Sequence, residues 1–271
     1  MIIGAMNHPH KEILDQIYKI GEMNFDYLEI TIEYPAATPQ KLIQKKDKIL
    51  EAISSYNLGV LAHLPWFFPL ANPYERIQNA TNKEIENAMH IATLLGAKTI
   101  TIHPDLVTPV SVQGRKLMLE NTIKTLDYLS KQAKKFGLEL CLETVDQKAL
   151  DVEEYKKILA NLDIYITLDI GHLSTYFSID LEDFIKIFKD KIKHIHLHDF
   201  KGSEDHLPLG AGRLELDKVV AALKKFYNNT ITLEVHSSDP HYLVYSKEAL
   251  ELAWYGKKAL EENKKYYGVK D

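Results

Sequence analysis

The feature that most constrains the fold is a regular alternation of short apolar, β-branched runs with longer stretches of helical periodicity. Neighbouring parallel strands need a crossover segment between them, and that segment is usually a helix. The strand-like runs begin near Ile2, Tyr27, Val60, Thr99, Glu139, Ile164, Ile192 and Thr230. Eight such units predict an α/β fold, namely a (β/α)8 TIM barrel that spans residues 1–271 as a single domain. A six-stranded open sheet is the alternative, but it would leave two units unused.

Local capping signals support the helical stretches. Thr38-Pro39 has the pattern of an N-cap followed by a first-turn proline, and Asp180 opens a later helix. Thr81 and Glu84 have the spacing of a capping box, and we also interpret Ser246 as the start of a helix. These signals predict where four of the helices begin.

The composition indicates a protein of a reducing compartment. Hydrophobic residues make up 45% of the chain, which is enough for a buried core. Cys141 is the single cysteine, so an internal disulfide is excluded, and the first residues lack the apolar segment of a signal peptide. Apolar runs of membrane-spanning length are absent from the sequence. We therefore expect a cytoplasmic protein that does not contact a membrane.

The charge balance bears on the partners. Lys and Arg number 33 against 38 Asp and Glu, which gives a net charge of −5. Without a global basic field, DNA is a disfavoured partner, although a local basic patch would still allow it. A small-molecule sugar is the favoured partner, and both a monomer and a homodimer are compatible with the sequence.

Six of the strand-like runs end on a side chain that can bind a metal ion. The carboxyl ends of parallel strands meet at one rim, so we expect these side chains to share a pocket. They are His63, His103, Glu143, Asp169, His196 and Glu234. Such imidazole and carboxylate ligands without a thiolate suit Zn, Mn or Co, and also Fe or Mg. The alternatives are salt bridges for the glutamates and backbone-bonded core histidines, because a buried glutamate needs a cation or a base as its partner.

The segment around the seventh strand is rich in further candidates. His194, His196 and His198 share one strand face, and the loop that follows contains Glu204 and His206. In the earlier turn Asp169-Ile-Gly-His172, the glycine permits a sharp exit that brings both polar side chains to the same rim. Trp66, in an aromatic loop after the third strand, is a candidate apolar wall for a substrate, with loop packing as the alternative.

With these residues in place, the whole chain resembles the xylose-isomerase-like barrel superfamily, which includes endonuclease IV and the tagatose/psicose 3-epimerase group. The order of the ligands resembles the trinuclear zinc set of endonuclease IV, with Glu204 where that family has aspartate and Asp205 as a competing ligand. The corresponding positions are His63, His103, Glu143, Asp169, His172, His196, Glu204, His206 and Glu234.

The resemblance to the epimerases implies a simpler site. It needs one divalent ion, held by Glu143, Asp169, His196 and Glu234, with His172 beside the substrate. The seventh strand reads His-Leu-His-Asp-Phe-Lys where the nuclease has His-Leu-Asn-Asp-Ser/Ala-Lys, and the loops after strands two, three and six contain no basic run for a DNA backbone. These departures favour the sugar enzyme.

We therefore expect a divalent-metal-dependent sugar or sugar phosphate isomerase or epimerase with one to three ions per chain. Glu143 and Glu234 are the expected catalytic groups, which transfer protons through a metal-stabilised enediolate. The candidate substrate-binding residues are Trp66, His172, His198 and Lys201. The alternative is an endonuclease-IV-like multi-zinc hydrolase of abasic DNA, and a third class is a metal-dependent binding protein without turnover.

Overall fold

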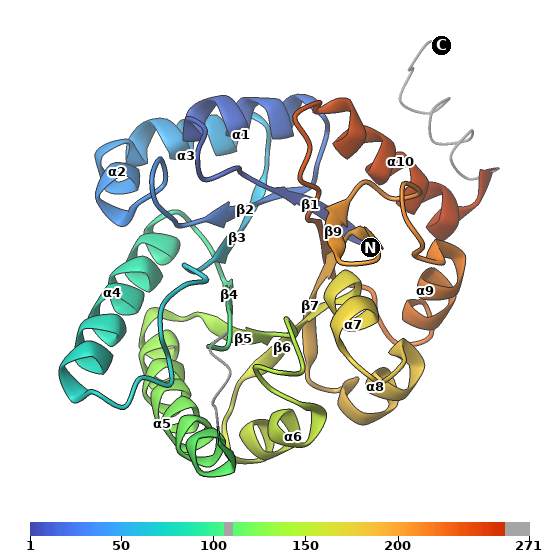
Figure 1. Cartoon of the computed structure of the whole chain (residues 1–271). Helices are drawn as coiled ribbons and strands as arrows, with labels where there is room; N and C mark the ends of the chain where they lie inside the picture. Colours follow the sequence, from blue (N-terminus) through green and yellow to red (C-terminus); the bar gives the residue numbers. More distant parts are fainter. Residues whose placement is uncertain (106–110, 258–271) are drawn as a thin grey trace.

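Eight parallel strands close into a barrel in the computed structural model of the chain, which describes residues 1–105 and 111–257 (Figure 1). The strands follow the order β1-β10-β7-β6-β5-β4-β3-β2 around the barrel. Their bounds are β1 Ile2–Met6, β2 Tyr27–Thr31, β3 Gly59–His63, β4 Thr99–Ile102, β5 Glu139–Glu143, β6 Tyr165–Asp169, β7 Ile192–Leu197 and β10 Thr230–Leu233. The predicted barrel is confirmed, and the six-stranded open sheet is wrong.

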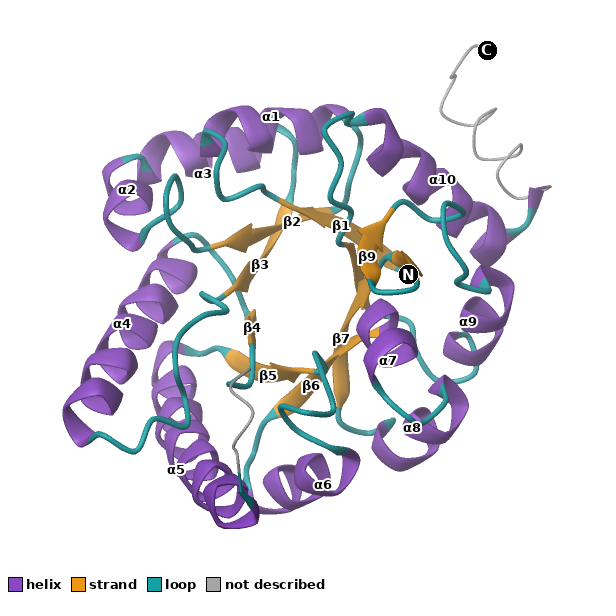
Figure 2. Cartoon of the chain, in the orientation of Figure 1, coloured by secondary structure: helices purple, strands orange, loops and turns teal. Residues whose placement is uncertain are grey.

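The helices form a ring outside the strands (Figure 2). Their bounds are α1 Ile13–Glu22, α2 Pro39–Gln44, α3 Lys46–Ser55, α4 Glu75–Leu94, α5 Val112–Phe136, α6 Val152–Asn161, α7 Ile170–Tyr176, α8 Leu181–Phe188, α9 Leu216–Leu223 and α10 His241–Tyr255. A short antiparallel hairpin of β8 Asp199–Lys201 and β9 Glu204–Leu207 follows β7 and packs against α7. Residues 106–110 and 258–271, which are part of the predicted single domain, lie outside the described residues, and that domain assignment stays a prediction.

The predicted helix starts hold at two of the four positions. The Thr38 side chain accepts a hydrogen bond at the start of α2, and Asp180 does the same for α8. Thr81 and Ser246 instead lie inside α4 and α10, where both are buried. The Ser246 hydroxyl donates to the carbonyl of Tyr242 one turn earlier, so it is satisfied without a helix end.

The two faces of the barrel strands differ in chemistry. Apolar residues such as Ile100 and Leu142 are buried in the core. The alternate positions carry polar side chains, and the Thr101 and Thr167 hydroxyls bond each other at 2.8 Å within the buried barrel. This alternation is the one expected from the strand periodicity. The polar side chains therefore line the barrel interior below the carboxyl ends of the strands.

None of the helices in residues 1–105 and 111–257 combines the length and the apolar character that crossing a bilayer requires.

Candidate metal centre

The carboxyl ends of the strands bring four predicted ligands to one point. In the register of β6 and β7, Asp169 pairs with His196, and Glu143 ends the adjacent strand β5. Glu234 follows β10, the neighbour of β7 on the other side. Each of these four residues offers a ligand atom, and the four atoms lie within 4.8 Å of one another. Glu143, Asp169 and His196 are buried.

The Glu143 carboxylate contacts three histidines of the cluster. One carboxylate oxygen, Oε2, lies 2.9 Å from His103 Nε2 and 3.1 Å from His63 Nε2. The other, Oε1, lies 3.2 Å from His196 Nδ1, and Glu234 Oε2 is at the same distance from that nitrogen. The carboxylates of Glu143 and Glu234 therefore both reach the His196 Nδ1 atom.

A second group of imidazoles lies beside the first. The rings of His172, His198 and His206 contribute nitrogens within 4.8 Å of one another. Asp169 connects the two groups, since its Oδ2 lies 3.2 Å from His172 Nδ1 and its Oδ1 lies 3.1 Å from His198 Nε2. His206 Nε2 is 3.3 Å from Glu234 Oε1. The arrangement therefore offers two neighbouring groups of potential ligand atoms.

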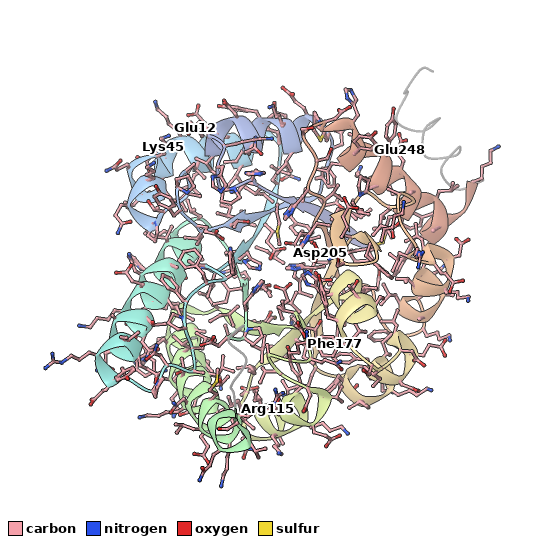
Figure 3. The ribbon with its side chains drawn as sticks, viewed as in Figure 1. Glu12, Lys45, Arg115, Phe177, Asp205 and Glu248 are labelled. Carbon is pink, nitrogen blue, oxygen red and sulfur yellow. The ribbon has the colours of Figure 1, made fainter. Side chains whose placement is uncertain are left out.

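The hairpin after β7 brings Asp205, and not Glu204, into this group. Glu204 pairs with Lys201 across the β8–β9 ladder, and both residues are exposed. Asp205 Oδ1 contacts His206 Nδ1 at 2.9 Å, and its Oδ2 accepts a hydrogen bond from the Tyr176 hydroxyl at 2.8 Å. Figure 3 shows Asp205 over the barrel opening, whereas Lys45 and Arg115 lie at the periphery. The backbone explains why Asp205 takes the place expected for Glu204. His206 has a φ of 54°, which interrupts the strict alternation that would point Glu204 and His206 the same way.

Several buried polar atoms of the cluster have no hydrogen-bond partner within the described part of the chain. They are His103 Nδ1, Asp169 Oδ2, His172 Nδ1, His198 Nε2 and Glu234 Oε2. Buried polar atoms are nearly always paired, and these belong to side chains that crowd together without hydrogen-bond geometry. Imidazole nitrogens and carboxylate oxygens are also the donors that divalent transition metals accept. The residues therefore fit a divalent cation.

Charge pairing within the cluster moves the proton equilibria of its members. Burial lowers the pKa of His172, but the interactions with the carboxylates of Asp169 and Glu143 together outweigh burial and raise this pKa to about 9. Burial likewise lowers the pKa of His206, but the interactions with the carboxylates of Glu234 and Asp169 together raise it to about 9. For Glu143 and Glu234, burial raises the pKa, but the surrounding histidines hold it well below the usual value. Both glutamates are therefore ionised at neutral pH.

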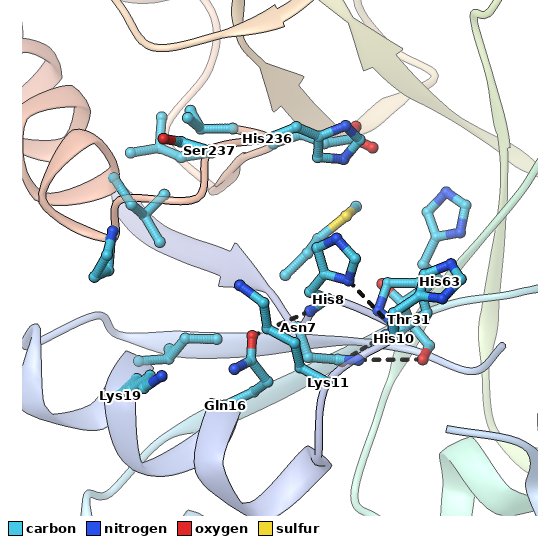
Figure 4. A pocket seen from close by; sticks show the side chains of 18 of the residues that line it. Asn7, His8, His10, Lys11, Gln16, Lys19, Thr31, His63, His236 and Ser237 are labelled. Carbon is cyan, nitrogen blue, oxygen red and sulfur yellow. Dashed lines mark hydrogen bonds between the residues drawn. The ribbon is translucent and has the colours of Figure 1, made fainter. Parts of the chain in front are cut away.

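A cavity of about 410 Å³ opens above the cluster. Its inner lining includes His63, His103 and Glu234, and its outer wall comes from the loops after β1 and β10, as Figure 4 shows for His8 and Ser237. This volume is in the range of small-molecule sites, which is roughly 300–1,000 Å³. The cavity is large enough for a sugar-sized molecule to reach the ligand atoms of Glu234.

The four candidate substrate-binding residues differ in their burial and in whether they line the cavity. Trp66 lines the cavity, where its Nε1 donates to Glu33 Oε1 at 3.1 Å. His172 and His198 are buried among the ligands. Lys201 is exposed on the hairpin.

Sequence reasoning missed two residues that the structure adds to the site. Glu29, in the middle of β2, is fully buried and contacts His196. The sequence feature that could have identified it is a carboxylate between Leu28 and Ile30 in an otherwise apolar strand. His236 stacks on the His206 ring at a centroid distance of 4.2 Å, and it lies two residues beyond Glu234, where strand alternation continues.

Two relatives in sequence cover much of the chain. The uncharacterized protein MJ1614 of Methanocaldococcus jannaschii is 31% identical over 184 residues, which is 66% of this chain and 71% of the relative. A probable endonuclease 4 of Aquifex aeolicus is 21% identical over 271 residues, which covers 91% of this chain and 92% of the relative.

Solved structures have the same fold. A D-tagatose 3-epimerase-like protein superposes with a TM-score of 0.82 at 24% identity, over 94% of this chain and 97% of that one. The IOLI protein with a binding zinc atom superposes with a TM-score of 0.73 at 21% identity, over 98% and 99% of the two chains. The family profile of the xylose isomerase-like TIM barrel matches residues 17–256. The chain therefore belongs to the xylose isomerase-like TIM barrel family.

Proposed function

We propose that the protein is an enzyme that acts on a sugar, and more narrowly a divalent-metal-dependent sugar or sugar phosphate isomerase or epimerase. One observation carries the proposal: the carboxylates of Glu143 and Glu234 both lie 3.2 Å from His196 Nδ1, in a four-residue ligand group with Asp169 below a cavity. The structural likeness to a D-tagatose 3-epimerase-like protein supports the same class.

The glutamates are the groups that move protons. Both are ionised at neutral pH, because neighbouring imidazoles hold their pKa values well below the usual value. One carboxylate accepts the proton from the carbon beside the sugar carbonyl and later releases it to solvent. The other carboxylate takes up a proton from solvent and delivers it to the opposite face of that carbon. A positioned acid–base pair of this kind contributes ~10²–10⁴-fold to the rate.

Other residues set the surroundings of the reacting carbon. Glu143, Asp169, His196 and Glu234 would hold a divalent cation, which when bound would polarise the sugar carbonyl and offset the negative charge that develops on its oxygen. Trp66 presents an apolar face to the cavity, and His172 offers a ring nitrogen beside Asp169.

Isotope exchange tests the assignment. Wild-type protein, loaded with Zn, Mn or Co, is incubated in D₂O with ketose, aldose and sugar phosphate pools, and deuterium at the carbon beside the carbonyl is measured by NMR. Glu234→Gln should lower the exchange rate by ~10²–10⁴-fold, because a general acid–base group is lost. The metal content of this variant is measured in parallel, since Glu234 is also a proposed ligand.

Glu139→Gln is the matched control for this experiment. Glu139 lies at the opposite end of β5 from Glu143 and pairs with Lys193 on the surface, so its loss should leave exchange unchanged. Unchanged exchange in Glu234→Gln with full metal content would reject the acid–base role.

The second candidate function is an endonuclease-IV-like hydrolase of abasic DNA. It is favoured by the contacts of His63 and His103 with Glu143, and by the additional group around His206 and Asp205, neither of which a one-metal isomerase needs. The likeness to a probable endonuclease 4 over 91% of this chain supports it too.

Elemental analysis and a nicking assay separate the two functions. About one ion per chain and no cleavage of an abasic-site duplex would favour the isomerase, whereas about three ions with cleavage would favour the hydrolase. His206→Ala should change the sugar reaction little and should abolish the cleavage.

A further inference from the structure

Glu29 is a charged group that the proposed chemistry does not use. It lies in β2, with no exposed surface, one layer below the proposed metal ligands. Its Oε1 is 3.2 Å from His196 Nε2, and its Oε2 is 2.9 Å from His194 Nε2. A carboxylate without exposure is costly unless it is fully paired, so its retention inside the barrel calls for a physical reason.

The group of Glu29, His194 and His196 has the composition of a metal site, but its bonding differs from that of the cluster above. Thr232 donates to Glu29 Oε2 at 2.5 Å, and the Thr230 hydroxyl lies 2.8 Å from His194 Nδ1. Neither Glu29 nor His194 is among the residues whose buried polar atoms remain unpaired in the described part of the chain. This lower group is therefore already satisfied by hydrogen bonds, and it is not a further cation site.

The two ring nitrogens of His196 face opposite ways. Nδ1 faces the carboxylates of Glu143 and Glu234, and Nε2 faces Glu29. An ionised carboxylate only accepts hydrogen bonds, so the Nε2–H of His196 donates to Glu29 and the Nδ1 lone pair is left for a cation.

We propose that Glu29 is a positioning residue that holds His196 in the orientation and tautomer required for metal binding through Nδ1. The inference rests on the proposed role of His196 as a ligand. Carboxylates that accept from a ligating histidine fix its ring and raise its basicity, and their loss typically weakens metal binding by about 10- to 100-fold.

The hydrogen bonds around Glu29 keep it in place. The Tyr27 hydroxyl and the Thr232 hydroxyl bond each other at 2.7 Å, and Thr232 in turn bonds Glu29. With His194 on the same oxygen, the carboxylate cannot turn away from His196 without breaking buried hydrogen bonds.

Glu29→Gln tests the inference through metal affinity. The amide keeps the size of the carboxylate, but its NH₂ group cannot accept a hydrogen bond, so one of the two histidines loses its acceptor. Zinc is titrated into metal-free protein in competition with a chromophoric chelator. We expect the dissociation constant to rise about 10- to 100-fold relative to wild type. Glu139→Gln, which removes a carboxylate at the surface, should bind zinc as wild type does.

Three outcomes are distinguishable. Folded Glu29→Gln that binds zinc with wild-type affinity overturns the inference while the proposed function stands. Wild-type protein that binds no divalent ion overturns both. If Glu29→Gln fails to fold, NMR of zinc-loaded wild type decides: a slowly exchanging, hydrogen-bonded Nε2 proton on His196 supports the inference, and zinc bound at Nε2 rejects it.

Discussion

At the scale of single residues, buried carboxylates organise the site. Glu29, Glu143 and Asp169 have no exposed surface, and each contacts at least two imidazoles. The carboxylates differ in how many of their oxygens are hydrogen-bonded. Both oxygens of Glu29 have hydrogen-bond partners, whereas Asp169 Oδ2 has none within the described part of the chain. We expect a cation to bind beside the unpaired atoms, and we expect the paired carboxylate to hold the proposed ligands in position.

The stability of the metal-free protein should depend on pH through His172 and His206. The folded pKa of each is raised from 6.5 to about 9 by neighbouring carboxylates. Their stabilising contribution is therefore fully present below pH 6.5 and is lost as the pH rises through about 9. The melting temperature of chelator-treated protein should fall across this window.

Calorimetric scans from pH 6 to 9.5 measure this effect. His206→Gln removes one of the two groups and should reduce the slope. A melting temperature that is constant or rises over the same window would contradict the assignment. Because a cation competes with these protons, metal affinity should change in the opposite sense and increase with pH.

The meeting of the strand-end side chains at one rim could be predicted from the sequence, but the choice between Glu204 and Asp205 could not. Periodicity places a strand residue on a face only while the backbone stays extended. The left-handed φ of His206 in the hairpin breaks that rule and brings Asp205 to the His206 ring. Glu29 was missed because a single carboxylate in an apolar strand has no local partner in the sequence. Its partners on β7 and β10 are more than 160 residues away.

At the scale of elements, the turn into α7 and the hairpin after β7 are shaped around buried side chains. Asp199 accepts hydrogen bonds from the backbone N–H groups of Gly210, Gly212 and Leu214 at 2.8–3.0 Å, and so fixes the loop after the hairpin. A Cβ added at Gly212 would lie 2.4 Å from the Asp199 carboxylate. This glycine is therefore required by close packing against Asp199.

Gly171 at the start of α7 has a similar constraint with a testable effect. A Cβ at this position would lie 2.1 Å from the His198 ring, which is fully buried. Gly171→Ala should therefore displace His198 and lower the free energy of unfolding by about 1–3 kcal/mol, as overpacking does. Urea denaturation of the metal-free protein measures this change.

Ser174→Ala on the same helix is the matched control. Ser174 is exposed, so its loss should change the free energy of unfolding by less than about 0.5 kcal/mol. A Gly171→Ala protein as stable as this control would mean that His198 adapts without cost.

At the scale of the whole molecule, the proposed ligands connect strands from all around the barrel. Glu143, Asp169, His196 and Glu234 follow or end β5, β6, β7 and β10, while His63 comes from β3. The unfolded chain cannot hold these groups together, so a bound cation favours the folded state alone. Metal binding should therefore stabilise the entire barrel.

The expected increase in the free energy of unfolding follows from mass action, because the cation binds only the folded state. A free metal concentration of 100 times the dissociation constant should add about 2.7 kcal/mol to the free energy of unfolding. Thermal scans with zinc and with a chelator measure it, and Glu139→Gln should show the full gain. Identical melting temperatures in zinc and in chelator would exclude a metal centre of this kind.

The sequence by itself determined the class of fold and the chemistry of its rim. The strand and helix periods specify eight parallel units, and a residue at a strand end lies on the same rim in each of them. Only the tertiary structure decided which polar groups meet below and beside that rim. The pairing of Glu29 with His194 and His196, and the entry of Asp205, depend on closure of the barrel and on one backbone conformation in a hairpin. Contacts between distant segments follow from packing and register, which local periodicity does not encode.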